Sequence, residues 1–170
     1  MATQAVSLFN GSTTPDPASA NVRIEPYSIK ATNDIFPFNV AIFDDTGTAD
    51  KVFGRIRIPK NYVSSPVAKL AWSSTVITGN VVWDLAYRVV SGDDTTSMDQ
   101  ATVQETVTVT DAAPGAAHRL LEPSFGALTA GNFSAAAQLE WQLIRRGDSG
   151  SDTMAGAAIV FDLQLEYADA

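Results

Sequence analysis

The only imidazole available for catalysis or metal binding in this chain of 170 residues is His118. A Ser–His–Asp hydrolase would have to use it, but no Gly-x-Ser-x-Gly sequence exists to present the serine. Cysteine is absent, which excludes disulfides, thiolate zinc sites and cysteine nucleophiles. A metal site built from several converging histidines is excluded because the chain has one histidine. The sequence therefore predicts a protein that is not an enzyme and has no metal or cofactor, with His118 on a surface or interface.

Aspartates gather in stretches that have the composition of turns. The three groups are Asp44, Asp45 and Asp50; Asp93, Asp94 and Asp99; and Asp148 and Asp152. Calcium favours such oxygen ligands, but none of the groups has the spacing of an EF-hand loop. Aspartate is common in turns because it tolerates left-handed backbone and bonds to nearby amides. We interpret these groups, and the integrin-type tripeptide Arg146-Gly147-Asp148, as turn chemistry.

Three further carboxylates could in principle form a glycosidase pair. Glu140, Asp162 and Glu166 alternate with apolar residues and are expected on the outward faces of two strands. A solvated sheet face explains them fully, so we assign them no catalytic role.

The charge balance excludes two classes of partner. Nineteen acidic and eleven basic residues give a net charge of −8. Nucleic acid and anionic lipid both require a positive footprint, so neither is an expected partner. The residues after Met1 form neither a basic segment nor an apolar core of a signal peptide, and no run of about 20 apolar residues could span a membrane. We expect synthesis in a host cytoplasm, with the acidity serving solubility or a basic partner surface.

Alternating apolar and polar side chains, the pattern of a half-buried strand, dominate the chain from about residue 35 onward. The alternating segments are 38–43, 55–58, 69–76, 81–90, 103–109, 138–143 and 157–167. Turn residues separate them, and no helix of ten residues is expected. The pattern predicts an all-β domain over 35–170, a jelly-roll-like antiparallel β-sandwich of about eight strands.

The first part of the chain, residues 1–34, has a different composition. It is rich in Ser, Thr, Ala, Asn and Pro early on, with the run Thr13-Thr14-Pro15-Asp16-Pro17. This composition favours an extended N-terminal arm, packed on its own domain or on a neighbour.

Most large aromatic side chains have the phase of core residues. Trp72, Trp83, Trp141, Phe161 and Tyr167 are expected to point inward. Phe43 and Phe53 are out of phase with their apolar neighbours and could lie outside, which makes them candidates for a binding or subunit surface. The candidate interface residues are Phe9, Tyr27, Phe43, Phe53 and His118.

Three segments carry a resemblance to a known group of proteins. They are VWDLAYR at 82–88, VTVTDAAPG at 107–115 and AAIVFDLQLEYAD at 157–169. Over residues 36–169 the pattern resembles the small β-sandwich structural proteins of tailed bacteriophages. The resemblance implies a decoration or cement protein that binds the major capsid protein lattice as a homotrimer and stabilises the shell. It also implies a place on the capsid surface of the virion, with the N-terminal arm reaching to a neighbouring subunit.

Two other functions stay open at this point. One is a tail, fibre or baseplate module of a virion. The other is a carbohydrate-binding β-sandwich, which would present aromatic side chains on one exposed sheet face.

Overall fold

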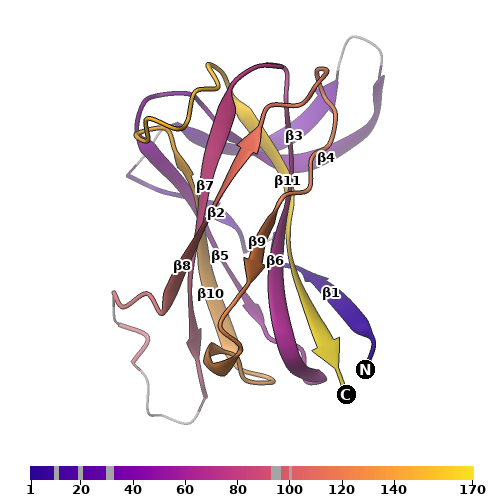
Figure 1. The fold of residues 1–170 in the computed structure, drawn as a ribbon, viewed down its shortest axis with the longest axis vertical. Coiled ribbons are helices and arrows are strands. Elements are labelled where there is room, and N and C mark those ends of the chain that lie inside the picture. Colours follow the sequence, from indigo (N-terminus) through magenta and orange to yellow (C-terminus); the bar gives the residue numbers. More distant parts are fainter. Residues whose placement is uncertain (10–11, 19–20, 30–32, 93–96, 100) are drawn as a thin grey trace.

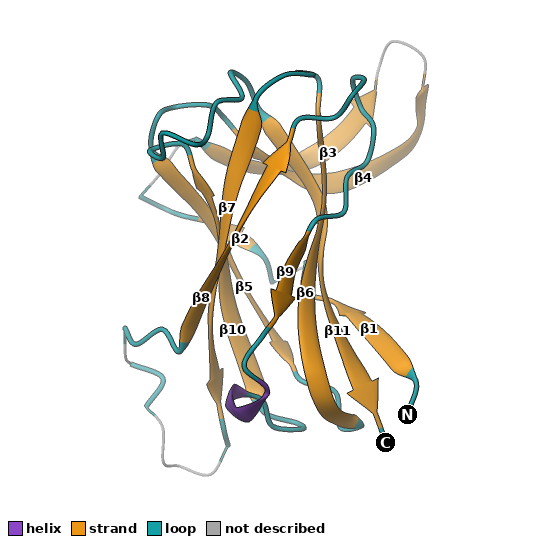
Figure 2. Cartoon of the chain, in the orientation of Figure 1, coloured by secondary structure: helices purple, strands orange, loops and turns teal. Residues whose placement is uncertain are grey.

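In the computed structural model the chain forms two antiparallel sheets packed face to face (Figures 1 and 2). The structure describes residues 1–170 except 10–11, 19–20, 30–32, 93–96 and 100, and no side chain in 27–38 is described. The predicted all-β, jelly-roll-like sandwich is confirmed. Among the described residues no helix has the length and apolar character needed to cross a membrane.

Eleven strands and one short 3-10 helix are found in the described parts of the chain. They are β1 (Thr3–Ser7), β2 (Thr14–Pro15), β3 (Val22–Ile29), β4 (Asn33–Phe43), β5 (Ala49–Arg57), β6 (Tyr62–Ser74), β7 (Asn80–Val90), β8 (Glu105–Ala112), β9 (Ser124–Ala127), η1 (Ala130–Asn132), β10 (Gln138–Arg146) and β11 (Ala158–Asp169).

Strands that follow one another in the chain mostly lie in opposite sheets. One sheet has the order β3-β4-β11-β6-β9, with β1 also paired to β11. The other has the order β2-β5-β10-β7-β8. The last two strands of the chain lie in the middle of the sheets: β11 lies between β4 and β6, and β10 lies between β5 and β7. This arrangement makes most pairings distant in sequence.

The core lies between the sheets and is built around aromatic rings. Phe43 and Trp83 meet edge to face with ring centroids 5.2 Å apart, and Trp72 and Trp83 meet at 5.9 Å. Such edge-on contacts add to the burial of apolar area. Trp72, Trp83, Trp141 and Tyr167 are all buried in this core, as the alternation predicted.

Two aromatic residues differ from the sequence prediction. Phe43 does not lie on a surface, because its side chain is fully buried against Trp83. Phe161 is only partly buried and packs against a second, smaller cluster made by Val40, Ile42 and Ile159. The physical reason is that β4 is buried on both faces: Ala41 and Phe43 face the core while Val40 and Ile42 face the second cluster. Alternation alone cannot identify the inward face of such a strand.

The predicted arm, residues 1–34, is part of the sandwich of its own chain. β1 pairs with β11 from Thr3↔Ala168 to Ser7↔Gln164, and β2 and β3 pair with β5 and β4. Leu8 and Val22 lie in the main core. The predicted boundary at 34/35 falls inside β4. Packing on its own domain was one of the two arrangements expected from the sequence, but the strands were not predicted. β1 buries almost no side-chain surface and is held by backbone hydrogen bonds and polar contacts such as Ala2 N to Asp169 Oδ1, 2.8 Å.

Candidate functional site

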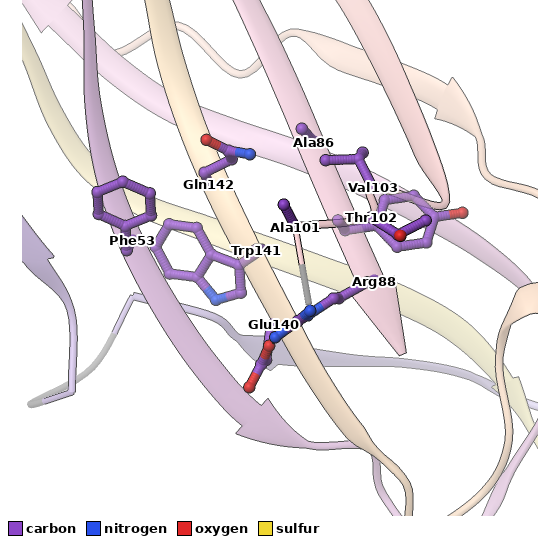
Figure 3. Close-up of a pocket in the computed structure, with 10 residues that line it drawn as sticks. Phe53, Ala86, Arg88, Ala101, Thr102, Val103, Glu140, Trp141 and Gln142 are labelled. Carbon is purple, nitrogen blue, oxygen red and sulfur yellow. The ribbon is translucent and has the colours of Figure 1, made fainter. Parts of the chain in front are cut away.

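The outer face of the sheet β2-β5-β10-β7-β8 carries three adjoining depressions. The first has a volume of about 240 Å³ and the second about 500 Å³, and both are lined by Phe53 and Glu140 (Figure 3). The third, about 400 Å³, shares Arg55 with the second. Together they form one open channel over the sheet, which we call the β5–β10 trough. The volumes of the second and third depressions fall within the range of ligand sites, roughly 300–1,000 Å³.

Strand register places the polar lining of the trough. β10 pairs with β5 on one side and β7 on the other, so that Gln142 lies between Phe53 and Ala86. One row along the sheet, Glu140 lies between Arg55 and Arg88. Because side chains alternate along each strand, these residues all project from the outer face while Leu139, Trp141 and Leu143 project into the core.

A glycine allows an indole to lie close under the trough. A Cβ atom at Gly54 would lie only 2.2 Å from Cζ2 of Trp141, its partner on β10. Both residues line the second depression. Any larger residue at Gly54 would displace the indole, so the Trp141 ring lies against the backbone of β5 here only because position 54 has no side chain.

One wall of the trough is the segment before β8. Ala101, Thr102 and Val103 line the first depression beside Ala86 (Figure 3). This wall is attached to β7 by hydrogen bonds: Val89 N donates to Gln104 Oε1 at 2.7 Å. The wall therefore covers the outer face of β7, whose Ala86 is buried.

The opposite wall comes from the N-terminal segment. Ser12 and Thr14 line the second depression, and Thr14 pairs with Phe53 through β2. Ser12 Oγ donates to the backbone oxygen of Arg55 at 3.0 Å. Lys51 Nζ lies 5.8 Å from the centre of the Phe53 ring, a cation–π contact that holds the ring at this wall.

Arginines dominate the charges of the trough. Arg88 Nε donates to Glu140 Oε2 at 2.6 Å, and Arg88 Nη2 donates to the carbonyl of Met98 at 2.9 Å. Arg57 Nε donates to the carbonyl of Ala136 at 2.8 Å. Arg55 is exposed.

A polar cluster closes the end of the sandwich next to the first depression. Tyr87 Oη donates to Glu105, which also accepts from Thr129 N at 3.0 Å and Thr129 Oγ1 at 3.1 Å. Burial, followed by the contact with Glu105, raises the pKa of Tyr87. Burial opposes ionisation of Glu105, but the hydrogen bonds from Tyr87 and Thr129 outweigh it and lower the pKa of Glu105 below its ordinary value. The cluster therefore holds the start of β8 with an ionised carboxylate.

The tripeptide Arg146-Gly147-Asp148 spans the last residue of β10 and the start of the turn that follows. Arg146 donates from Nε to Asp148 at 2.8 Å and from Nη1 to Asp84 at 2.8 Å. The hydrogen bonds with Asp148 and Asp84 raise the pKa of Arg146, and the one with Arg146 lowers the pKa of Asp148. Both charged side chains are thus engaged within the chain, as the turn interpretation predicts.

The candidate interface residues are not brought together. Phe53 lines the trough and Phe43 is in the core. Phe9 is partly buried against the core, and His118 is exposed between β8 and β9 with a positive φ of 65°. Tyr27 lies in β3, and its side chain is outside the described residues. The assignment of Phe9, Tyr27, Phe53 and His118 to an interface stays a prediction, whereas Phe43 is fully buried inside the sandwich.

The trough is equipped for binding. It offers the outward ring of Phe53, guanidinium donors, a carboxylate and amide groups. Within the part of the chain that the structure describes, no three His, Asp or Glu side chains converge as they would around a metal ion.

Solved structures of several carbohydrate-binding modules have the same architecture as this chain. A xylan-binding domain of Paenibacillus barcinonensis, named CBM22-1, aligns over 98% of this chain and 94% of its own with a TM-score of 0.53 and 10% identity. The family 11 carbohydrate-binding module of Clostridium thermocellum, in complex with a mixed-linked tetrasaccharide, aligns over 96% and 94% with a TM-score of 0.53 and 11% identity. The chain has the fold of these carbohydrate-binding modules.

A third carbohydrate-binding module has the same fold. The CBM36-1 domain of a multidomain xylanase from the hindgut metagenome of Trinervitermes trinervoides aligns over 99% of this chain and all of its own, with a TM-score of 0.51 and 14% identity. No protein-family model and no curated protein matches the sequence. At these identities the carbohydrate-binding modules establish the jelly-roll architecture of the chain.

Sequence reasoning missed most of the trough. Arg55 and Arg57 were visible as the polar partners of Ile56 and Ile58, and Glu140 was visible as an outward residue. The signal was therefore their phase along the strand. What the sequence lacked was the pairing of β5 with β10, which joins residues more than 80 positions apart.

Proposed function

We propose that this protein is a non-catalytic glycan-binding module that holds an extended polysaccharide chain in the β5–β10 trough. The observation that carries the proposal is the trough itself, a channel open to solvent that combines the Phe53 ring with hydrogen-bonding side chains. A sugar ring has an apolar C–H face and a rim of hydroxyl groups. The C–H face packs on the negative face of an aromatic ring, and the hydroxyl groups form hydrogen bonds with amide, carboxylate and guanidinium groups.

Two features of the trough support a chain-like ligand. Its depressions adjoin along β5 and β10 and are not closed at the top. Its walls are anchored by hydrogen bonds to β5 and β7, so the channel is formed before a ligand arrives. Preorganisation of this kind limits the entropy lost on binding. The Paenibacillus and Clostridium modules, one xylan-binding and the other in complex with a tetrasaccharide, support the same proposal.

Replacing Phe53 with alanine tests the proposal. We expect the affinity for a bound polysaccharide to fall about 10-fold, because an aromatic stack contributes roughly 0.5–1.5 kcal/mol beyond its buried area. Affinity electrophoresis against xylan, mixed-linked β-glucan, galactan and polygalacturonate would identify the ligand, and titration calorimetry would give the change. Gln142→Ala, in the same row, should weaken binding as well.

The matched control is Leu120→Ala. Leu120 is an exposed apolar residue between β8 and β9, outside the trough. Its removal should leave binding unchanged. Failure of the wild-type protein to bind any polysaccharide, or equal losses for Phe53→Ala and Leu120→Ala, would contradict the proposal.

The assembly role implied by the resemblance to phage structural proteins is a second candidate, and one observation favours it. Among the described residues β1 pairs with β11 alone, and four of its five side chains are exposed. An edge strand with a free row of backbone groups can pair with a strand of another chain. Under this proposal the partners are copies of this chain or a capsid protein, and the location is the capsid surface.

Light scattering of the purified protein tests the second candidate. We expect a homotrimer whose mass does not fall on dilution, and co-sedimentation with expanded capsids of the matching phage. A monomer that stays in the supernatant would contradict the assembly role and would not affect the proposal of glycan binding.

A further inference from the structure

The charge of the trough has the opposite sign to that of the chain. Three arginines, Arg55, Arg57 and Arg88, and one acid, Glu140, are the charged residues that line it. This leaves two positive charges in the trough, whereas the whole chain carries −8. Seven arginines occur in the sequence, so nearly half of them gather in one channel.

Part of this positive charge is uncommitted. Arg88 is paired with Glu140, and the pair neutralises itself. Arg57 uses Nε for the carbonyl of Ala136, which leaves its terminal N–H groups for another acceptor. Arg55 is exposed, and within the described part of the chain its guanidinium has no hydrogen bond or ion pair. Two guanidinium groups are therefore available to a ligand.

The arrangement along β5 suits a repeating anion. Phe53, Arg55 and Arg57 are successive outward residues of β5, so their attachment points are about 7 Å apart. A chain lying along β5 meets first an aromatic ring and then two guanidinium forks. A guanidinium matches a carboxylate with two parallel hydrogen bonds, which a neutral hydroxyl cannot reproduce.

We propose that the β5–β10 trough selects a carboxylate-bearing polysaccharide, a chain of uronic acid residues, through Arg55 and Arg57. This inference rests on the proposed glycan-binding function and names its substrate class. Glu140 lies beside Arg55 in the register and would repel such a ligand, but its pairing with Arg88 offsets that charge. The guanidinium groups of Arg55 and Arg57 take the carboxylates, and Phe53 takes the face of a sugar ring.

The test compares polymers that differ only in their carboxylates. Polygalacturonate and polymannuronate are each titrated into the protein beside the same polymer after reduction of its carboxyl groups to alcohols. We expect the acidic form of at least one pair to bind at least ten-fold more tightly than its reduced form. The difference should shrink as salt is raised, because the two arginines are exposed to solvent.

The variant Arg55→Gln/Arg57→Gln should lose this preference and keep the weaker binding of the reduced polymer. Arg119→Gln is the matched control, because Arg119 is an exposed arginine outside the trough. Exposed substitutions of this kind leave stability nearly unchanged, and thermal unfolding of each variant checks this.

The outcomes separate the inference from the function on which it rests. Equal affinity for acidic and reduced polymers overturns the uronate inference and keeps glycan binding. Binding of neither form of either polymer also overturns it, and the fate of glycan binding is then decided by xylan, mixed-linked β-glucan and galactan. Tighter binding of a single-stranded oligonucleotide, lost in Arg55→Gln/Arg57→Gln, would overturn it in favour of phosphate.

Discussion

Replacing Arg145 with alanine is expected to lower the free energy of unfolding by about 3–5 kcal/mol, the usual cost of removing one partner of a buried ion pair. The side chain of Arg145 is only 1% exposed, as is that of its partner Asp152. Its guanidinium donates to the Asp152 carboxylate at 3.0 and 3.2 Å and to the carbonyls of Met154 and Gly156 at 2.8 and 2.6 Å. Without it, the buried carboxylate of Asp152 loses its cationic partner and keeps the N–H of Val82 as a donor, and the carbonyls of Met154 and Gly156 each lose a hydrogen bond.

Urea unfolding at neutral pH measures this effect, and the next residue in the chain provides the control. Arg146 also forms ion pairs, but its side chain is 39% exposed. The exposed pair with Asp148 contributes about 0–1 kcal/mol. The side chain of Asp84 is buried, but it keeps the hydrogen bond from Thr108 Oγ1, so Arg146→Ala should cost less than Arg145→Ala. Similar losses for the two variants would mean that Arg145 is not the buried anchor of the 147–157 segment.

A second large effect is expected from Leu8→Ala, which should lower the free energy of unfolding by about 2–5 kcal/mol. Leu8 is 2% exposed, and it packs in the main core beside residues from both sheets. Its backbone N–H also donates to the carbonyl of Leu163 at 2.6 Å. The truncated side chain would leave a cavity that the neighbouring strands can close only in part.

Calorimetry on Leu8→Ala, with Gln4→Ala as control, decides whether the N-terminus is a detachable arm. Gln4 is exposed and makes one side-chain hydrogen bond, to Asp169 at 3.0 Å, so its loss should cost about 1 kcal/mol or less. Deleting residues 1–8 should destabilise the protein at least as much as Leu8→Ala. Unchanged stability in the deletion variant would restore the sequence-based expectation of a separate arm.

The sandwich could be predicted from the sequence wherever a strand buries one face. β10 alternates cleanly, with Leu139, Trp141 and Leu143 inward and Gln142 outward, and the structure has this phase. The same reasoning failed for β4, where Phe43 and Ile42 are both buried on opposite faces. It also failed for β1, whose place depends on backbone pairing with β11 more than on apolar side chains.

The candidate site could not be predicted from the sequence for a different reason. The outward phase of Arg55, Arg57 and Glu140 was readable, but their neighbourhood was not. It depends on the register that sets Glu140 opposite Arg55 and on the space at Gly54 that Trp141 fills. A one-residue slip in that register would turn the whole lining inward. Without an observed pairing, outward residues on separate strands cannot be grouped into one surface.

The central places of β10 and β11 have a consequence for synthesis on the ribosome. Each is the strand on which its neighbours pair, yet each emerges after almost all of them. While β4 to β9 are already outside the ribosome, β5 and β7 each have one edge that waits for β10, and β4 and β6 each have one edge that waits for β11. Unpaired edges of this kind are where nascent chains associate wrongly. The domain therefore completes its two sheets only after β11 is released, and a chaperone that shields exposed edges would raise the yield of folded protein.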